Sequence, residues 1–144
     1  MEILLKVSTN DRIISIIDDE LDIAELFRDA ICGNIDGISV VTFNDPVLAL
    51  EHFTENKQDY ALIISDLRTP SLNGLELLKR IKSSSPNVRT ILMSAYNFEL
   101  DERYQTYLKE GIIDSSIEKP VTIDDFCQNV RDEFQVYQLK SHLR

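Results

Sequence analysis

Residues 60–66 read Tyr-Ala-Leu-Ile-Ile-Ser-Asp, and this stretch decides the fold. Its apolar run from Tyr60 to Ile64 shows no alternation of polar and apolar residues, which is typical of a strand covered by helices on both faces. The run Ile13-Ile14-Ser15-Ile16-Ile17 has the same character. We therefore expect both segments to be central strands of a parallel sheet.

Strand-like runs alternate with segments of helical period along the whole chain, which predicts an α/β fold with parallel strands joined by crossover helices. The expected strands are residues 12–17, 37–43, 60–65, 88–94 and 112–117. Core-facing stripes of helical period are expected at Leu21, Ala24, Phe27, Ala30 and Ile31 and at Leu75, Leu78 and Ile81. Three more helices are marked by Leu48, Leu50 and Phe53, by Leu100, Tyr104, Tyr107 and Leu108, and by Ile123, Phe126, Val130, Phe134 and Tyr137. Pro46 begins the second helix, which Asn44 or Asp45 could cap.

The composition indicates one globular domain over residues 1–144. The 144 residues, 43% of them hydrophobic, suffice for one substantial core but not for two ordinary domains. The net charge of −10 disfavours direct binding to nucleic acid, because phosphates would be repelled. The apolar run at residues 3–5 is too short for a signal peptide or a membrane span, so we expect a cytoplasmic protein without membrane contact.

The cysteines and histidines do not suggest a further site. Cys32 and Cys127 are far apart and lack partners at zinc-ligand spacing, so we expect two free, mostly buried thiols. His52 and His142 are each isolated in the sequence, and we expect no catalytic role for either.

Polar residues follow or end four of the expected strands. Asp18-Asp19-Glu20 follows the first strand, Asp66 the third, Ser94 ends the fourth and Lys119-Pro120 follows the fifth. If the sheet has the order 2-1-3-4-5, these groups gather at the carboxyl ends of the strands, where open α/β sheets bind ligands. Crowded carboxylates favour a divalent cation with oxygen ligands, and Mg²⁺ fits this set better than Ca²⁺.

The same residues predict a phosphoryl chemistry for Asp66. A carboxylate can act as a nucleophile toward phosphorus when the charge on the incoming group is neutralised. Lys119 supplies a cation for the phosphoryl oxygens, and Ser94 supplies a hydroxyl donor. Each feature alone also has a local explanation, such as helix capping by the Asp pair, but their joint occurrence at strand ends favours the site.

These motifs, in this order, resemble those of the receiver domains of two-component response regulators. The matching stretches are Ile16-Ile17-Asp18-Asp19-Glu20, Ile63-Ile64-Ser65-Asp66, Pro70 with Gly74, Leu92-Met93-Ser94-Ala95, and Glu118-Lys119-Pro120. The resemblance covers about residues 12–134 and implies a doubly wound, flavodoxin-like (βα)5 fold with five parallel strands in the order 2-1-3-4-5. Residues 1–11 are then an N-terminal extension, and residues 135–144 extend the last helix.

The resemblance implies a magnesium site and a phosphoacceptor. Asp19 and Asp66 would ligate Mg²⁺ directly, with Asp18 acting through water and the backbone carbonyl of Arg68 as a further ligand. Asp66 would receive a phosphoryl group from the phosphohistidine of a sensor histidine kinase or phosphotransfer protein.

The same resemblance implies roles for the remaining site residues. Ser94 and Lys119 would contact the phosphoryl group, and the Lys119–Pro120 peptide bond would be cis. Such a protein is not an enzyme acting on external substrates, since it catalyses only its own phosphorylation and dephosphorylation. It switches a surface that binds a downstream protein effector.

Four positions depart from the common pattern or vary within it. Thr69 stands where receivers often carry Met, and Ser116 stands where many carry a switch aromatic. We expect a modified switch in which Tyr104 or Tyr107 takes part. Arg68 and Tyr96 are expected to tune the phosphoryl lifetime.

Two features of the chain ends leave alternatives open. The apolar stripe of Val136, Leu139 and Leu143 could form a homodimer or partner face, or pack on the domain itself. Residues 2–7 could form an edge strand or a tail.

Other functions are less consistent with the residues. A pseudo-receiver that is never phosphorylated would not need the intact acidic, hydroxyl and lysine set. An aspartate-based phosphatase usually carries a second acid where this chain has Arg68, and no glycine-rich loop for a nucleotide follows the first strand.

Overall fold

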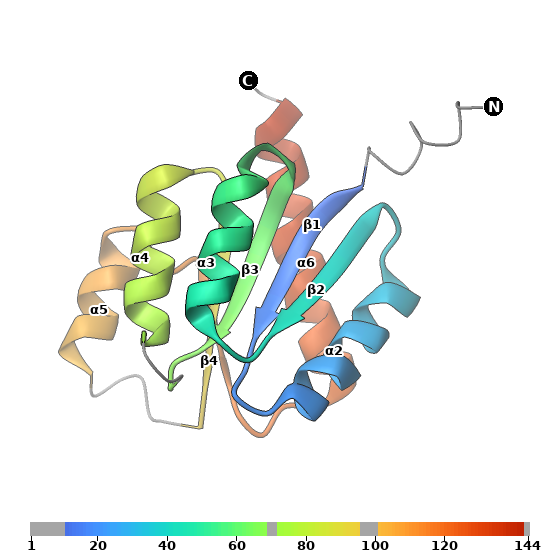
Figure 1. The fold of residues 1–144 in the computed structure, drawn as a ribbon, viewed down its shortest axis with the longest axis horizontal. Helices are drawn as coiled ribbons and strands as arrows, with labels where there is room; N and C mark the ends of the chain where they lie inside the picture. The colour runs from blue at the N-terminus through green and yellow to red at the C-terminus, as the bar shows by residue number, and fades with distance from the viewer. Residues whose placement is uncertain (1–10, 69–71, 96–100, 143–144) are drawn as a thin grey trace.

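The computed structural model describes residues 11–68, 72–95 and 101–142 (Figure 1). The described strands form one parallel sheet in the order β2-β1-β3-β4-β5, which confirms the predicted doubly wound fold. The strands are β1 Arg12–Ile17, β2 Ile38–Phe43, β3 Tyr60–Asp66, β4 Arg89–Ser94 and β5 Ser115–Glu118. The helices are α2 Leu21–Asn34, α3 Pro46–Glu55, α4 Gly74–Ser84, α5 Glu102–Lys109 and α6 Ile123–His142, with a short turn η1 at Lys57–Asp59.

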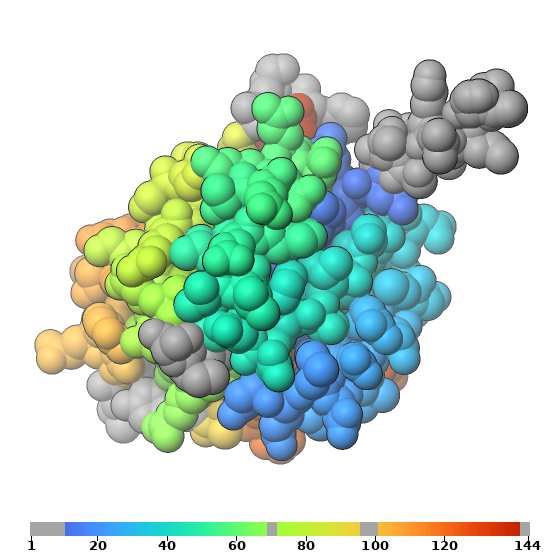
Figure 2. Space-filling model, in the orientation of Figure 1, coloured from blue at the N-terminus to red at the C-terminus, as the bar shows by residue number. Residues whose placement is uncertain are grey.

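Helices cover both faces of the sheet. α3, α4 and α5 lie on one face, and α2 and α6 lie on the other (Figure 1). The space-filling view shows α3 and α4 packed together over the strands behind them (Figure 2). Ile63 packs beneath α3, α4 and α5, whereas Leu62 and Ile64 pack beneath α2 and α6. This two-sided burial explains why the stretch that decides the fold is apolar without alternation.

The second helix begins as its sequence predicts. The Asp45 carboxylate accepts a hydrogen bond from the Val47 backbone N–H at 2.9 Å, and Pro46 occupies the first turn. Asp45, rather than Asn44, is therefore the capping residue.

The last strand is shorter than predicted and lies later in the chain. We expected residues 112–117, but β5 covers Ser115–Glu118. Gly111 has a φ of 77°, and the backbone N–H groups of Ile112 and Ile113 both donate to the Tyr107 carbonyl. Residues 111–113 therefore close the end of α5 and are not available for the sheet.

One residue of the predicted core-facing stripes is exposed. Leu21 is 38% exposed, so its assignment was wrong. Leu48 and Leu108 lie in helices, as predicted, and are 50% and 41% exposed. In α3 the buried neighbour is Ala49, because helical period alone does not decide between adjacent apolar residues.

The predictions for the thiols and for His52 have mixed outcomes. Both cysteines are free, and Cys127 is buried, but Cys32 is exposed, which corrects the expectation of two mostly buried thiols. His52 is not isolated in the fold, since its Nδ1 lies 2.6 Å from the Tyr60 hydroxyl.

The extended last helix packs on its own domain at least as far as Tyr137. This residue is buried and its ring stacks on Phe134 with centroids 6.2 Å apart, so Tyr137 contributes to the core. Leu139, two residues further on, is 62% exposed.

Some predictions concern residues outside the described ranges: residues 2–7, Thr69, Pro70, Tyr96, Leu100 and Leu143. Among the helices that the structure describes, none combines the length and apolar character that a membrane crossing requires.

Candidate functional site

Three carboxylates gather at the carboxyl ends of β1 and β3. One oxygen each from Asp18, Asp19 and Asp66 lies within 4.8 Å of the others. Asp18 is fully buried and Asp66 is 8% exposed, whereas Asp19 faces solvent. Oxygen ligands at this spacing are suited to a hard divalent cation. The structure thus brings together the acidic residues that the sequence suggested as metal ligands.

The backbone around the first two acids fixes their places. β1 pairing continues past Ile17, because the Asp18 N–H donates to the Phe43 carbonyl at 3.0 Å. The Asp18 Oδ1 atom then accepts from the Glu20 N–H at 2.9 Å, just before α2 begins. Asp18 therefore stabilises the turn before α2, whereas the N-cap residue of that helix is Glu20, whose side chain makes no capping hydrogen bond.

Asp66 is held by the strand that it ends and by the segment that follows. The Leu67 N–H donates to the Met93 carbonyl at 2.8 Å, and the Arg68 N–H lies 3.2 Å from Asp66 Oδ1. The N–H of Gly74, at the start of α4, donates to the Leu67 carbonyl at 2.9 Å. The first turn of α4 thus lies directly against the backbone of Asp66.

Lys119, which follows the edge strand β5, also reaches the carboxylates. Its ammonium donates to Asp66 Oδ2 at 2.8 Å and to Asp18 Oδ2 at 3.1 Å. Burial alone would lower the pKa of this amine, but its hydrogen bonds and the charges of Asp66 and Asp18 outweigh burial, and the pKa is raised. Lys119 therefore stays protonated at neutral pH. Its formal charge of +1 against −3 for the three acids leaves −2, which a divalent cation would balance.

Ser94 and the residues beside it complete a pocket of about 430 Å³. Asp19, Asp66, Ser94, Ala95 and Lys119 all line it, whereas the fully buried Asp18 does not. Ser94 is the last residue of β4 and is buried.

Arg68 lines the same pocket. The Lys119–Pro120 peptide bond is cis, as the resemblance implied, and the Lys119 N–H donates to the Ser94 carbonyl at 2.9 Å.

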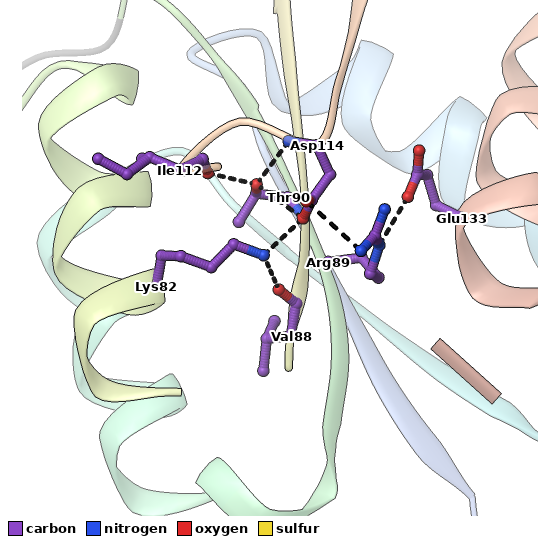
Figure 3. Close-up of polar contacts among 7 residues, drawn as sticks. All are labelled: Lys82, Val88, Arg89, Thr90, Ile112, Asp114 and Glu133. Carbon is purple, nitrogen blue, oxygen red and sulfur yellow. Dashed lines mark hydrogen bonds and ion pairs between the residues drawn. The ribbon is translucent and has the colours of Figure 1, made fainter. Parts of the chain in front are cut away.

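A polar network that sequence reasoning missed anchors the strand leading to Lys119 (Figure 3). Asp114, directly before β5, accepts from the Lys82 ammonium at 2.6 Å and from the Thr90 N–H at 2.9 Å. Arg89 lies 3.4 Å from the other oxygen of Asp114 and donates to Glu133 of α6 at 2.8 Å. The network joins α4, β4, the start of β5 and α6.

This network matters because β5 has little hydrophobic anchoring of its own. Ile117 is its one buried residue, and the strand reads Ser-Ser-Ile-Glu. We infer that Asp114 sets the position of β5 and so helps to place Lys119 at its far end.

Ser116 contacts an aromatic residue of the neighbouring helix. Its Oγ atom lies 3.0 Å from the hydroxyl of Tyr104, a buried residue of α5. Tyr107, the other tyrosine we considered, lies instead beneath the Lys79 ammonium, 5.8 Å from the ring centroid. Of the two tyrosines, Tyr104 is therefore the one placed to follow movements of β5 at Ser116.

Replacing Tyr104 by Phe should lower the free energy of unfolding by about 1 kcal/mol, because the partly buried Ser116 hydroxyl loses its partner while the ring of residue 104 stays in place. Urea denaturation would measure the change. Tyr107→Phe is the matched control, since Tyr107 is equally buried and its hydroxyl has no hydrogen bond among the described residues. Equal losses in the two variants would contradict a specific contribution of the Tyr104 hydroxyl.

Comparisons with known proteins agree with this site. The family model of the response regulator receiver domain matches residues 14–131. Sporulation initiation phosphotransferase F of Bacillus subtilis (strain 168) is 32% identical over 134 residues, which cover 92% of this chain and 98% of that protein. The crystal structure of a response regulator receiver domain protein from Clostridium thermocellum superposes with a TM-score of 0.76 at 27% identity, covering 89% of this chain and 98% of that one.

Larger regulators match as well. The DNA-binding transcriptional regulator NtrC of Escherichia coli (strain K12) is 31% identical over 126 residues, or 88% of this chain. The chain spans 25% of the length of that relative. With a family model that covers most of the chain and a carboxylate–lysine cluster in the expected place, this chain belongs to the response regulator receiver domain family.

Proposed function

We propose that this chain is a cytoplasmic, single-domain phosphoacceptor that takes a phosphoryl group onto Asp66 from the phosphohistidine of a sensor histidine kinase or phosphotransfer protein. The observation that carries this proposal is the Lys119 ammonium, which bridges Asp66 and Asp18 beside the third carboxylate. Membership of a signalling family, rather than of a family of enzymes, supports the same conclusion.

The transfer needs a nucleophile, a path for its attack and charge compensation. An oxygen of the Asp66 carboxylate forms the bond to phosphorus while the phosphorus–nitrogen bond of the phosphohistidine breaks, and the imidazole nitrogen keeps the electron pair. Lys119 would turn from the Asp66 oxygen to the phosphoryl oxygens. Ser94 would donate its hydroxyl to the same group from the end of β4.

Mg²⁺ is the cation that we propose for the acidic cluster. Asp19 and Asp66 would hold it directly together with the backbone carbonyl of Arg68. Both oxygens of Asp18 already accept hydrogen bonds, from Glu20 and from Lys119, which favours a role for Asp18 through water. When bound, Mg²⁺ would neutralise charge on the phosphoryl oxygens.

The partners follow from this chemistry. The donor would be a phosphohistidine protein, and the output would be a downstream protein effector whose binding surface changes on phosphorylation. The net charge of −10 opposes direct nucleic-acid binding. A homodimer through the last helix would use the stripe to which the exposed Leu139 belongs.

Phosphorylation with a small donor tests the proposal. With Mg²⁺ and acetyl phosphate, the intact mass of the wild type should rise by one phosphoryl group. Asp66→Asn, or wild type with a chelator, should show no labelling. Asp59→Asn, which changes an exposed acid at the opposite end of β3, is the matched control and should label like the wild type. Folded wild type that stays unlabelled would instead support the pseudo-receiver alternative.

A further inference from the structure

A polar groove of about 470 Å³ runs along β5, separate from the pocket of Asp66. Residues Ser116, Ile117 and Glu118 form one wall. The other wall comes from the first half of α6, and no described residue lines both this groove and the pocket of Asp66. The groove therefore needs an explanation of its own.

One wall of the groove is an open strand edge. β5 is the last strand of the described sheet, and β4 is its strand neighbour there. Backbone N–H and C=O groups of a strand alternate between its two sides, so those on the outer side of β5 have no strand partner within the described residues. Such an edge can accept an extended peptide as an additional strand.

The opposite wall is a polar stripe of α6. Asp125, Gln128, Asn129 and Asp132 recur at spacings of three and four residues and so lie along one face of the helix. The two ends of this stripe are seven residues, or about 10 Å, apart, which corresponds to about three residues of an extended chain. The stripe thus matches the length of a short peptide strand.

The charged side chains of the residues that line the groove are all acidic. Glu118, Asp125 and Asp132 contribute carboxylates, and neither Lys nor Arg lines the groove. Within the part of the chain that the structure describes, none of these three acids enters an ion pair. A ligand that fits would therefore carry positive charge.

We propose that this groove binds an extended segment of a partner protein that contains lysine or arginine residues and that adds to β5 as a further strand. The inference deepens the proposed function, on which it rests for the existence of a protein partner. A second copy of this chain fits less well, because its net charge is −10 and each copy would bring the same acidic groove to the contact. The net charge of −10 would also repel nucleic acid.

A labelled peptide of alternating lysine and valine is the probe for this site. Its binding to the unphosphorylated protein would be followed by fluorescence anisotropy. In the variant that combines Glu118→Gln, Asp125→Asn and Asp132→Asn, we expect affinity to fall by at least about tenfold, because the complementary charges are lost. Thermal unfolding followed by circular dichroism would verify that the variant is folded.

A matched variant distinguishes the effect of the acids in the groove from the effect of the net charge of the protein. Glu51→Gln, Glu55→Gln and Asp59→Asn change the net charge by the same amount at exposed acids of α3 and η1, across the sheet from α6. Binding by this variant should stay within about twofold of the wild type. Equal weakening in the two variants would show that the peptide responds to overall charge, which would overturn the proposal.

Two further measurements test the mode of binding and the occupant. A peptide methylated on every backbone nitrogen keeps its charges but cannot donate hydrogen bonds to β5 from either edge, so it should bind much more weakly, and unchanged affinity would overturn strand addition. Sedimentation that shows a dimer of the wild type, lost in the groove variant, would assign the groove to a second copy and also overturn the proposal. Asp66→Asn should bind the peptide like the wild type. A negative result for peptide binding therefore leaves the phosphorylation test unaffected, and a negative result for phosphorylation leaves the peptide-binding test unaffected.

Discussion

Replacing Asp114 by Asn should lower the free energy of unfolding by about 3–5 kcal/mol, because a buried cation loses its counter-charge. The Lys82 side chain is 11% exposed, and Asp114 is its one acidic partner among the described residues. Arg89 keeps its contact with Glu133, so the loss should arise mainly at Lys82 (Figure 3). Urea denaturation of the wild type and the variant would measure the difference.

An exposed ion pair supplies the control. Asp29→Asn removes the contact with Arg28 on α2, where the two side chains are 73% and 36% exposed. Solvent screens such a pair, and the variant should change the free energy of unfolding by less than about 1 kcal/mol. Similar effects of the two substitutions would contradict the structural role of Asp114.

The effect of Asp114→Asn should also depend on pH. Burial lowers the pKa of Lys82 more than Asp114 raises it. When the raising contribution is removed, the pKa in the folded variant should fall further below that of the unfolded chain. The unfolded state then binds more protons than the folded state between these two pKa values, so the stability of the variant should rise with pH in that window. Denaturation curves at neutral and alkaline pH would show a smaller deficit at the higher pH.

The position of the candidate site could be predicted because its residues occupy equivalent places in a regular fold. Asp18, Asp66 and Lys119 all stand at carboxyl ends of parallel strands, and the sheet order brings those ends together. Local sequence and topology were therefore sufficient to locate these three residues at one site.

The Asp114 network could not be predicted in the same way. Lys82 and Asp114 are 32 residues apart, and Arg89 and Glu133 are 44 residues apart. None of these residues belongs to a motif, and charged residues near the ends of helices and strands are common on solvated surfaces. Their pairing depends on how α4 and α6 pack on the sheet, which hydrophobic period does not specify to the precision of a hydrogen bond.

The contact between Tyr104 and Ser116 is an intermediate case. The absence of an aromatic residue at position 116 drew attention to the two tyrosines of α5, and the spacing of that helix placed both in the core. Only the three-dimensional packing distinguishes Tyr104, whose hydroxyl reaches Ser116, from Tyr107.

Replacing Gly74 by Ala should both destabilise the protein and slow phosphorylation of Asp66. A Cβ atom at Gly74 would lie 2.4 Å from the Asp66 carbonyl oxygen and 3.0 Å from the Leu67 Cα atom. Both are backbone atoms that cannot rotate away, so either α4 or the end of β3 must move. Overpacking of this kind typically destabilises by about 1–3 kcal/mol.

The displacement should reach the phosphoacceptor because the clash is with its own backbone. A misplacement of about 1 Å at a reacting group can slow a reaction on the order of 100-fold, and we expect labelling by acetyl phosphate to slow by at least about tenfold. Mass spectrometry at short times would measure the rate.

Gly33 in α2 provides a control, because its replacement by Ala should stabilise the protein where Gly74→Ala destabilises it. Nothing lies within 4 Å of a Cβ atom built there, so Gly33→Ala should stabilise the helix by about 0.5–1 kcal/mol and leave labelling unchanged. If Gly74→Ala matched the wild type in both stability and labelling rate, α4 could not be what fixes the backbone of Asp66. If stability fell while labelling kept its rate, the backbone would have yielded on the α4 side, and the position of Asp66 would depend on β3 and its pairing with β4 alone.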